Sequence, residues 1–304
     1  MAIQERQAVF RGVFPYLVTP LDTHENINHP CIQQLCTHLL DAGVHGLTPL
    51  GSTGENSYLS FSQSLEVVEA VVDACAGRAL VVPGLTSNST KAAIEQARAY
   101  GQAGVDGIVL TLDAYFPLPQ ASVKDYFLRV ADAVDLPLIL YTNPTFQKIQ
   151  LGLDLIVELS QDLRFMGIKD ASSNTGHLLS IARHCREGFG IYAASAHISA
   201  SVMLLGGMGL FAGPACVLPR EYLRLYDLCQ TGQWDQAMAM QKVLWQFNEV
   251  FAKFNLAACV KAALEGLGFD VGPTIAPQPA LPSSVKDEIC AITREIQQEV
   301  AQLQ

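Results

Sequence analysis

Short apolar segments alternate with longer segments of helical periodicity over roughly the first 220 residues of the chain. The short segments are almost continuously hydrophobic, which is typical of parallel strands that are buried on both faces. They predict eight strands, at residues 13–19, 46–50, 79–85, 107–112, 137–142, 165–169, 190–195 and 209–212.

The segments between these strands carry apolar residues at three- and four-residue spacing, as amphipathic helices do. They predict helices at 30–42, 61–76, 90–103, 123–134, 153–160 and 177–185. After Pro219 the pattern is helical only, at 221–231, 233–254, 256–267 and 283–301, with a proline-rich connector at 268–284.

Repeated strand–helix units of this kind predict an α/β fold, a closed (β/α)8 TIM barrel, over residues 1–225. Residues 226–304 are expected to form a C-terminal helical extension that packs on the barrel as part of one structural unit. A doubly wound open sheet is the alternative, but no GxGxxG motif follows a strand.

Composition and charge narrow the class of protein. Hydrophobic residues make up 50% of the 304 positions and charged residues 16%, which favours extensive burial over disorder. The formal net charge is −10 without a basic block, so a nucleic-acid partner is not expected. No apolar run reaches the roughly 18 residues of a membrane-spanning helix, and the first residues do not resemble a signal peptide. We therefore expect a soluble cytoplasmic protein without a membrane partner.

The cysteines and histidines give no sign of a metal site. The eight cysteines include no CxxC pair, and they are expected to be small buried residues in a reducing compartment. The seven histidines show neither HxH nor HExxH spacing. No metal is therefore expected.

Lys169 is the most informative residue of the chain. It ends an apolar strand in the sequence GIKD, whereas the other seven lysines lie in helical or loop segments. Active sites of (β/α)8 barrels lie at the carboxyl ends of the strands, and a desolvated amine there becomes a nucleophile near neutral pH. Such an amine condenses with a ketone to a Schiff base, an electron sink for C–C or C–O cleavage. The alternative is a buried Lys169 paired with the adjacent Asp170.

Other strand ends add groups to the same edge. Tyr141 ends the fifth strand and offers a hydroxyl for proton transfer, or else is an ordinary barrel aromatic. The loop Gly51-Ser52-Thr53-Gly54-Glu55 offers hydroxyl and N–H groups that suit a carboxylate, and it lacks the GK[ST] ending of a phosphate loop. Glu55 is expected at a helix start or an interface. Tyr115 follows the fourth strand.

Together these features resemble the family of dihydrodipicolinate synthase and N-acetylneuraminate lyase, the pyruvate-type class I aldolases. The resemblance runs from Gly12 to about residue 300. Its landmarks are FPYLVTPLD (14–22), GSTGEN (51–56), AYFPL (114–118), LYTNP (140–144), GIKDASSN (167–174), LLGGMGLFAG (204–213) and VKAALEGLG (260–268).

The resemblance implies a role for each matching residue. Lys169 would form the Schiff base, with Tyr141 as the general acid/base beside it. Ser52 and Thr53, next to Gly51, would bind the keto-acid carboxylate, and Thr53 would also belong to the catalytic set. Tyr115 would reach into a neighbouring subunit's site, which implies a homotetramer built as a dimer of dimers. No organic cofactor is implied.

Departures from the family pattern concern the substrate. The synthase usually carries Arg at the position of Phe146, where the guanidinium group holds the second substrate's carboxylate. A phenyl ring has no N–H groups to form the paired hydrogen bonds of a guanidinium. The usual Gly-Asp-Asp is Ala194-Ser195-Ala196, and a usual Ile is Phe211. We expect Phe146, Ala194 and Phe211 to contact the substrate, with Phe116 helping Phe146 and Phe211 to line a less polar pocket.

The function expected from these features is that of a catabolic Schiff-base lyase, an aldolase or dehydratase. Its partner would be a small 2-keto acid, less anionic than the synthase's substrate. A true dihydrodipicolinate (4-hydroxy-tetrahydrodipicolinate) synthase, a non-catalytic keto-acid-binding barrel and a metal-dependent aldolase are the alternatives.

Overall fold

The computed structural model describes residues 10–303 except residues 173, 196 and 197. Within them, seven parallel strands form one sheet in the order β1-β9-β8-β7-β6-β5-β4, and β2 pairs with β3 in a second sheet. The strands are β1 (Gly12–Pro15), β2 (Gly46–Leu47), β3 (Leu80–Val81), β4 (Gly84–Ser87), β5 (Ile108–Leu112), β6 (Leu138–Thr142), β7 (Phe165–Asp170), β8 (Gly190–Ala194) and β9 (Gly209–Ala212).

The two-stranded sheet fills the gap between the edges of the larger one. Thr48 beyond β2 forms a parallel bridge with Tyr16 beyond β1, and its N–H donates to the Pro15 carbonyl at 3.0 Å. On the other side the Gly84 N–H donates to the Pro49 carbonyl at 2.8 Å. The strands therefore close into a ring, and the predicted (β/α)8 barrel is confirmed.

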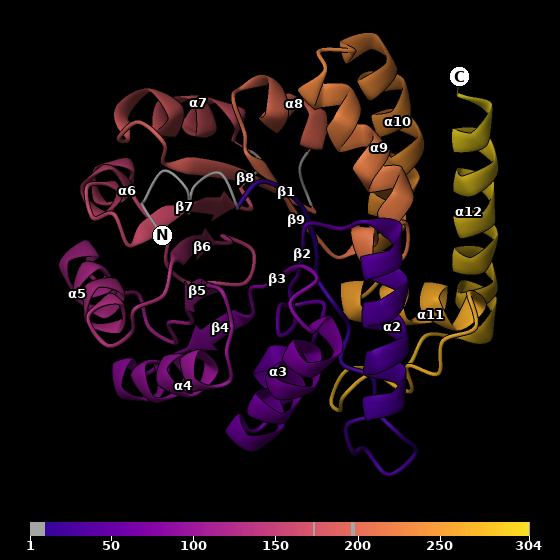
Figure 1. Cartoon of the computed structure of the whole chain (residues 1–304), viewed down its shortest axis with the longest axis horizontal. Coiled ribbons are helices and arrows are strands. Elements are labelled where there is room, and N and C mark those ends of the chain that lie inside the picture. Colours follow the sequence, from indigo (N-terminus) through magenta and orange to yellow (C-terminus); the bar gives the residue numbers. More distant parts are fainter. Residues whose placement is uncertain (1–9, 173, 196–197, 304) are drawn as a thin grey trace.

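Helices surround the barrel, and the last three lie together on one side, with α12 outermost (Figure 1). No helix of the described residues is long and apolar enough to cross a bilayer. The helices are α2 (His29–Ala42), α3 (Phe61–Cys75), α4 (Thr90–Gln102), α5 (Gln120–Ala131), α6 (Leu153–Ser160), α7 (Thr175–His184), α8 (Ser199–Leu204), α9 (Pro219–Gln230), α10 (Trp234–Phe251), α11 (Leu256–Gly266) and α12 (Ser283–Gln302).

Capping residues set the starts of two helices near the functional end. Ser60 and Gln63 form a capping box at the start of α3, in which each side chain bonds the other's backbone N–H. Asn255 caps α11 by accepting from the Ala258 N–H at 3.0 Å. The turn between α10 and α11 thereby brings Leu256 to the mouth of the barrel.

Several strand boundaries differ from the predicted ones. The predicted strand 79–85 is split into β3 and β4 because Pro83, between them, has no N–H to donate. The strand predicted at 46–50 ends its ladder at Leu47, and Leu50 takes a left-handed conformation with φ 63° as the chain turns into its loop. Residue 225, where the barrel was expected to pass into the extension, lies within α9 (Pro219–Gln230).

A separate hydrophobic cluster fills the interior of the barrel. The rings of Phe14 and Phe211 stack there at 4.6 Å between centroids, and Tyr192 packs edge-on against Phe211 at 5.1 Å. The whole cluster consists of Phe10, Phe14, Tyr16, Val82, Val109, Ile139, Met166, Tyr192, Met208 and Phe211. The barrel is therefore a packed core, and Tyr16 is the member of this cluster that also lines the cavity described next.

Candidate active site

A cavity of about 260 Å³ opens where four barrel strands end. Tyr141, Lys169 and Ala194 reach it from β6, β7 and β8, and Tyr16 directly follows β1. The remaining lining residues are Ser52, Thr53, Asn143, Thr145, Phe146, Ala171, Ser195, Asn248, Phe251, Ala252 and Leu256. A second cavity of about 730 Å³ adjoins it and shares part of its wall.

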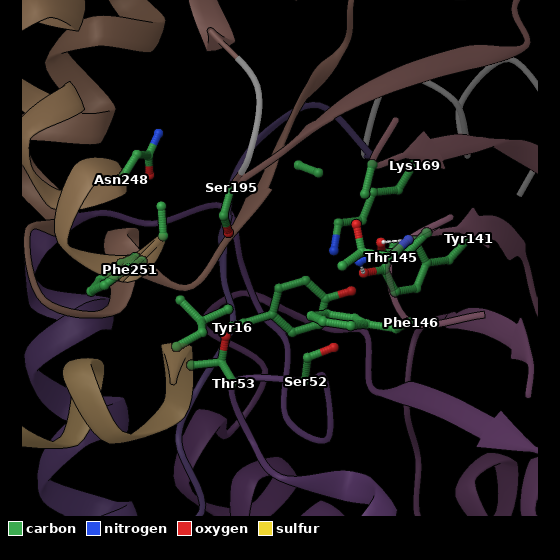
Figure 2. A pocket seen from close by; sticks show the side chains of 15 residues that line it. Tyr16, Ser52, Thr53, Tyr141, Thr145, Phe146, Lys169, Ser195, Asn248 and Phe251 are labelled. Atoms are coloured by element: carbon green, nitrogen blue, oxygen red, sulfur yellow. Dashed lines mark hydrogen bonds between the residues drawn. The ribbon is translucent and has the colours of Figure 1, made fainter. Parts of the chain in front are cut away.

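Lys169 and Tyr141 are direct partners in the pairing of β7 with β6. Paired residues of neighbouring parallel strands point to the same face of a sheet, so both side chains enter the cavity. The Lys169 Nζ lies 3.9 Å from the centroid of the Tyr141 ring and 4.3 Å from that of Tyr16 (Figure 2). The strand register alone thus brings an amine and a phenol together.

The Lys169 amine is desolvated and has no carboxylate partner among the described residues. The side chain is 5% exposed, and burial lowers its pKa to about 7. Asp170 points to the other face of β7, where it accepts from the Ser172 N–H and lies 3.5 Å from the Nε2 of His177. Successive side chains of a strand point to opposite faces of the sheet. Lys169 and Asp170 therefore do not form the buried ion pair that was the alternative.

Tyr141 is held by polar neighbours at its hydroxyl. The Nδ2 of Asn143 donates to that hydroxyl at 3.0 Å. Burial raises the pKa of Tyr141, and hydrogen bonds with Asn143 and Ser52 partly oppose the rise. The phenol is consequently protonated at neutral pH and can give a proton to a substrate oxygen.

The loop after β2 presents Ser52 and Thr53 to the cavity. Gly54 donates to the Gly51 carbonyl at 3.0 Å, which makes the turn tight. Gly51 has to be glycine because a Cβ there would lie 2.2 Å from the Tyr16 ring. Thr53 is buried and Ser52 is exposed to the opening. Two adjacent hydroxyls and turn N–H groups at this position suit a carboxylate.

Glu55, the last residue of this loop, is buried in an ion pair with Lys261 of α11. Its Oε2 lies 2.5 Å from the Lys261 Nζ. Its Oε1 accepts from the Ile275 N–H at 2.7 Å and from the Gln278 Nε2 at 2.6 Å. The interface expected for Glu55 is thus one within the chain, between the loop and the C-terminal extension.

The structure does not bring all the predicted site residues together. Lys169, Tyr141, Ser52, Thr53, Phe146 and Ala194 line the first cavity, and Gly51 lines the second. Phe211 lies among the residues of the barrel interior and lines neither cavity, because its ring stacks on Phe14. The expected contact of Phe211 with a substrate is therefore replaced by a role in supporting the site from within the barrel.

The two aromatic residues after β5 also lie outside the cavities. Tyr115 is 73% exposed and Phe116 is 70% exposed, and their rings pack edge to face at 4.8 Å. Phe116 therefore does not line the less polar pocket within this chain. Ala196, which belongs to the segment that departs from the family pattern, lies outside the described residues.

Several residues that line the first cavity were not predicted as site residues. Tyr16 and Asn143 stand in the motifs FPYLVTPLD and LYTNP, so a signal for them was present. Asn248, Phe251 and Leu256 come from α10 and α11, and only the packing of the extension on the barrel brings them to the site. Among the described residues, no group of three or more His, Cys, Asp or Glu side chains is placed to hold a metal ion.

Comparisons with known proteins agree over nearly the whole chain. A model described as the dihydrodipicolinate synthetase family matches residues 9–298. A 4-hydroxy-tetrahydrodipicolinate synthase from Methanospirillum hungatei is 33% identical over 270 residues, 87% of this chain and 92% of the relative. An uncharacterized DapA-like lyase from Halobacterium salinarum is 32% identical over 267 residues, 88% of this chain and 87% of the relative.

One solved structure of similar fold contains a bound keto acid. It is YagE, a prophage protein from Escherichia coli K12 that belongs to the dihydrodipicolinic acid synthase family and was solved in complex with pyruvate. It is 25% identical and superposes with a TM-score of 0.90, covering 95% of this chain and 99% of that one.

Proposed function

This chain belongs to the dihydrodipicolinate synthetase family, and we propose that within it the protein is a catabolic aldolase or dehydratase of a 2-keto acid. The general reaction class follows from membership of the family: the chain is a class I lyase that acts on pyruvate or a related keto acid. Members of the family work through a lysine Schiff base and use no cofactor.

The observation that carries the assignment of residues is the pairing of Lys169 with Tyr141. The amine, whose pKa burial lowers to about 7, attacks the C2 carbonyl of the keto acid as a neutral nucleophile. Tyr141 gives its proton to the carbinolamine oxygen, which leaves as water, and the imine forms. Ser52 and Thr53 hold the C1 carboxylate. In the aldolase reaction the protonated imine then accepts the electron pair of the C3–C4 bond, and Tyr141, now a phenolate, takes the proton of the C4 hydroxyl, whose oxygen leaves as the aldehyde carbonyl. In a dehydratase the imine instead accepts the electron pair of a C3–H bond, and Tyr141 passes that proton to the C4 hydroxyl, which leaves as water.

The far end of the cavity supports a substrate that is less anionic than the synthase's. Lys169 is the only charged side chain among the described residues that line the first cavity, and the second cavity adds the carboxylates of Glu55 and Asp113. A distal carboxylate would find no cation there and would face Asp113. An uncharged apolar group would instead contact Phe146, which is 60% exposed, and Phe251. Figure 2 shows Phe251 and Asn248 across the cavity from Lys169 and Tyr141.

The first experiment is borohydride trapping with pyruvate, followed by peptide mass spectrometry. We expect a reduced adduct on Lys169 in the wild-type protein and none in Lys169→Ala. Wild-type protein that forms no adduct with pyruvate or with longer 2-keto acids would overturn the proposal and revive the non-catalytic, keto-acid-binding barrel.

A synthase is the second candidate, favoured by the name of the relative from Methanospirillum hungatei. A coupled assay with pyruvate and aspartate semialdehyde, run beside a series of neutral aldehydes, distinguishes the two. We expect turnover with a neutral aldehyde to exceed that with the anionic one. Phe146→Arg should not improve turnover of the preferred neutral substrate. A preference for aspartate semialdehyde would make the protein a synthase with a carboxylate anchor elsewhere.

We further propose a homotetramer, a dimer of dimers in which Tyr115 approaches a neighbouring subunit's site. The exposed Tyr115 and Phe116 rings support a contact at this place, because exposed aromatic side chains are enriched at protein interfaces. All eight cysteines are unpaired, which supports a cytoplasmic location.

A further inference from the structure

Tyr16 presents a buried hydroxyl that the protein itself does not satisfy. The side chain is 3% exposed, and its hydroxyl has no hydrogen-bond partner among the described residues. Several other buried polar side-chain atoms of the described residues also lack a hydrogen-bond partner. Among them, the Tyr16 hydroxyl is the one whose residue lines the first cavity. An unsatisfied buried donor costs stability, and such a group at the wall of a cavity is available to bond a molecule bound there.

The position of the ring aims this hydroxyl at the reacting end of the cavity. Tyr16 follows β1 and its ring packs against Gly51, the residue before Ser52 and Thr53. On its other side the Lys169 Nζ lies 4.3 Å from the ring centroid. Figure 2 shows the hydroxyl end turned toward Lys169 and Tyr141. The phenol thus lies between the amine and the loop that would hold the carboxylate.

The protonation state of Tyr16 limits what it can do. Burial, and to a lesser degree the neighbouring Tyr141 phenol, raise its pKa well above the usual value. It therefore keeps its proton and acts as a hydrogen-bond donor rather than as a base.

We propose that Tyr16 is a substrate-binding residue whose hydroxyl donates a hydrogen bond to an oxygen of the bound 2-keto acid. This inference rests on the proposed keto-acid chemistry. Tyr16 makes and breaks no covalent bond; Tyr141 carries the proton transfers. The oxygen it contacts is one of those at C1 or C2, because the hydroxyl lies between Ser52 and Lys169.

The test is Tyr16→Phe, followed by two measurements. The first is the pyruvate concentration that gives half the maximal rate of borohydride-trapped adduct, which we expect to rise by about 10- to 100-fold, the effect of one hydrogen bond to a charged group. The second is the thermal midpoint of the ligand-free protein, which we expect not to fall, because the hydroxyl has no partner to lose.

Tyr192→Phe is the matched control. The Tyr192 hydroxyl is also buried in the barrel, but it donates to the Phe10 carbonyl at 2.8 Å and lines neither cavity. We expect this variant to lose thermal stability and to trap pyruvate at the wild-type concentration.

The outcomes separate this inference from the proposed function. Wild-type trapping with an unchanged pyruvate dependence in Tyr16→Phe would overturn the role of Tyr16 alone. A fall in the thermal midpoint as large as that of Tyr192→Phe would show that the hydroxyl is bonded within the free protein, and would also overturn it. Failure of the wild-type protein to trap any keto acid would remove both proposals together.

Discussion

At the scale of single residues, the proposed chemistry depends on the desolvation of Lys169. Two aromatic rings flank the Lys169 amine and no carboxylate among the described residues compensates its charge. This arrangement favours the neutral, nucleophilic amine at the cost of folding stability, since the ammonium form is penalised in the folded state.

That cost predicts a pH-dependent stability. The pKa of Lys169 is about 7 in the folded protein and about 10.4 in an unfolded chain, so between these values the unfolded state binds more protons. The contribution of Lys169 to the free energy of unfolding is therefore most unfavourable below about pH 7, and the penalty decreases as the pH rises toward 10. We expect Lys169→Met to be more stable than the wild-type protein at pH 7, with the difference shrinking at pH 9, as measured by urea unfolding.

Lys91→Met is the control for this series. Lys91 is 87% exposed on α4 and faces Glu95 at 3.8 Å, so its removal should leave the pH dependence of unfolding unchanged. A wild-type protein and a Lys169→Met variant with parallel pH profiles would show that the amine is not desolvated.

The predictable part of the site is the part that strand geometry determines. The sequence could place Lys169 and Tyr141 at one cavity because each ends an apolar strand, and strand ends of a barrel converge. Tyr16 could not be assigned in the same way, because its importance lies in a missing hydrogen bond that only packing reveals. Nor could Asn248 and Phe251, since no pattern in an amphipathic helix says which barrel opening it will cover.

At the scale of elements, a buried ion pair between Glu55 and Lys261 joins the loop after β2 to α11. Removing one partner leaves an uncompensated charge, so Lys261→Met should lower the free energy of unfolding by about 3–5 kcal/mol. The pyruvate concentration needed for trapping should also rise, because Glu55 anchors the loop that carries Ser52 and Thr53. Chemical denaturation and borohydride trapping measure the two effects.

An exposed ion pair of the extension provides the comparison. Lys286 and Glu265 approach to 2.7 Å, but both side chains are more than a third exposed. Lys286→Met should therefore change stability by about 0–1 kcal/mol and leave trapping unaffected. Equal effects of the two lysine substitutions would argue against a special role for the buried pair. The double variant Glu55→Gln/Lys261→Met should recover part of the loss.

Element boundaries could be predicted only where nothing interrupts the periodicity. The sequence pattern placed helix 153–160 at the observed bounds of α6, yet it treated residues 79–85 as one strand. A continuous run of hydrophobic residues indicates burial but says nothing about hydrogen bonding. It therefore does not show that Pro83 has no backbone N–H and so interrupts the strand. The six residues of α8 lie in a glycine-rich apolar stretch that carries no helical period, and no helix was predicted there.

At the scale of the whole molecule, the exposed aromatic residues after β5 predict the mode of assembly. Phe116→Asp places a charge among apolar side chains and should convert a tetramer to a smaller species in sedimentation velocity, because a buried unpaired charge is costly. Leu163→Asp is the control, as Leu163 is 46% exposed in the turn after α6. A wild-type protein that sediments as a monomer, or a Phe116→Asp variant that stays tetrameric, would contradict the proposed interface.

The Glu55–Lys261 pair has a consequence for attempts to exchange parts between relatives. Consider a hybrid protein that joins this barrel to the C-terminal extension of another protein. Its loop after β2 would keep its position only if the new extension supplied an amine in place of Lys261 and an amide in place of Gln278, both in contact with Glu55. A crossover after the last strand would therefore separate Glu55 from Lys261 and Gln278, the residues that join the loop to the extension.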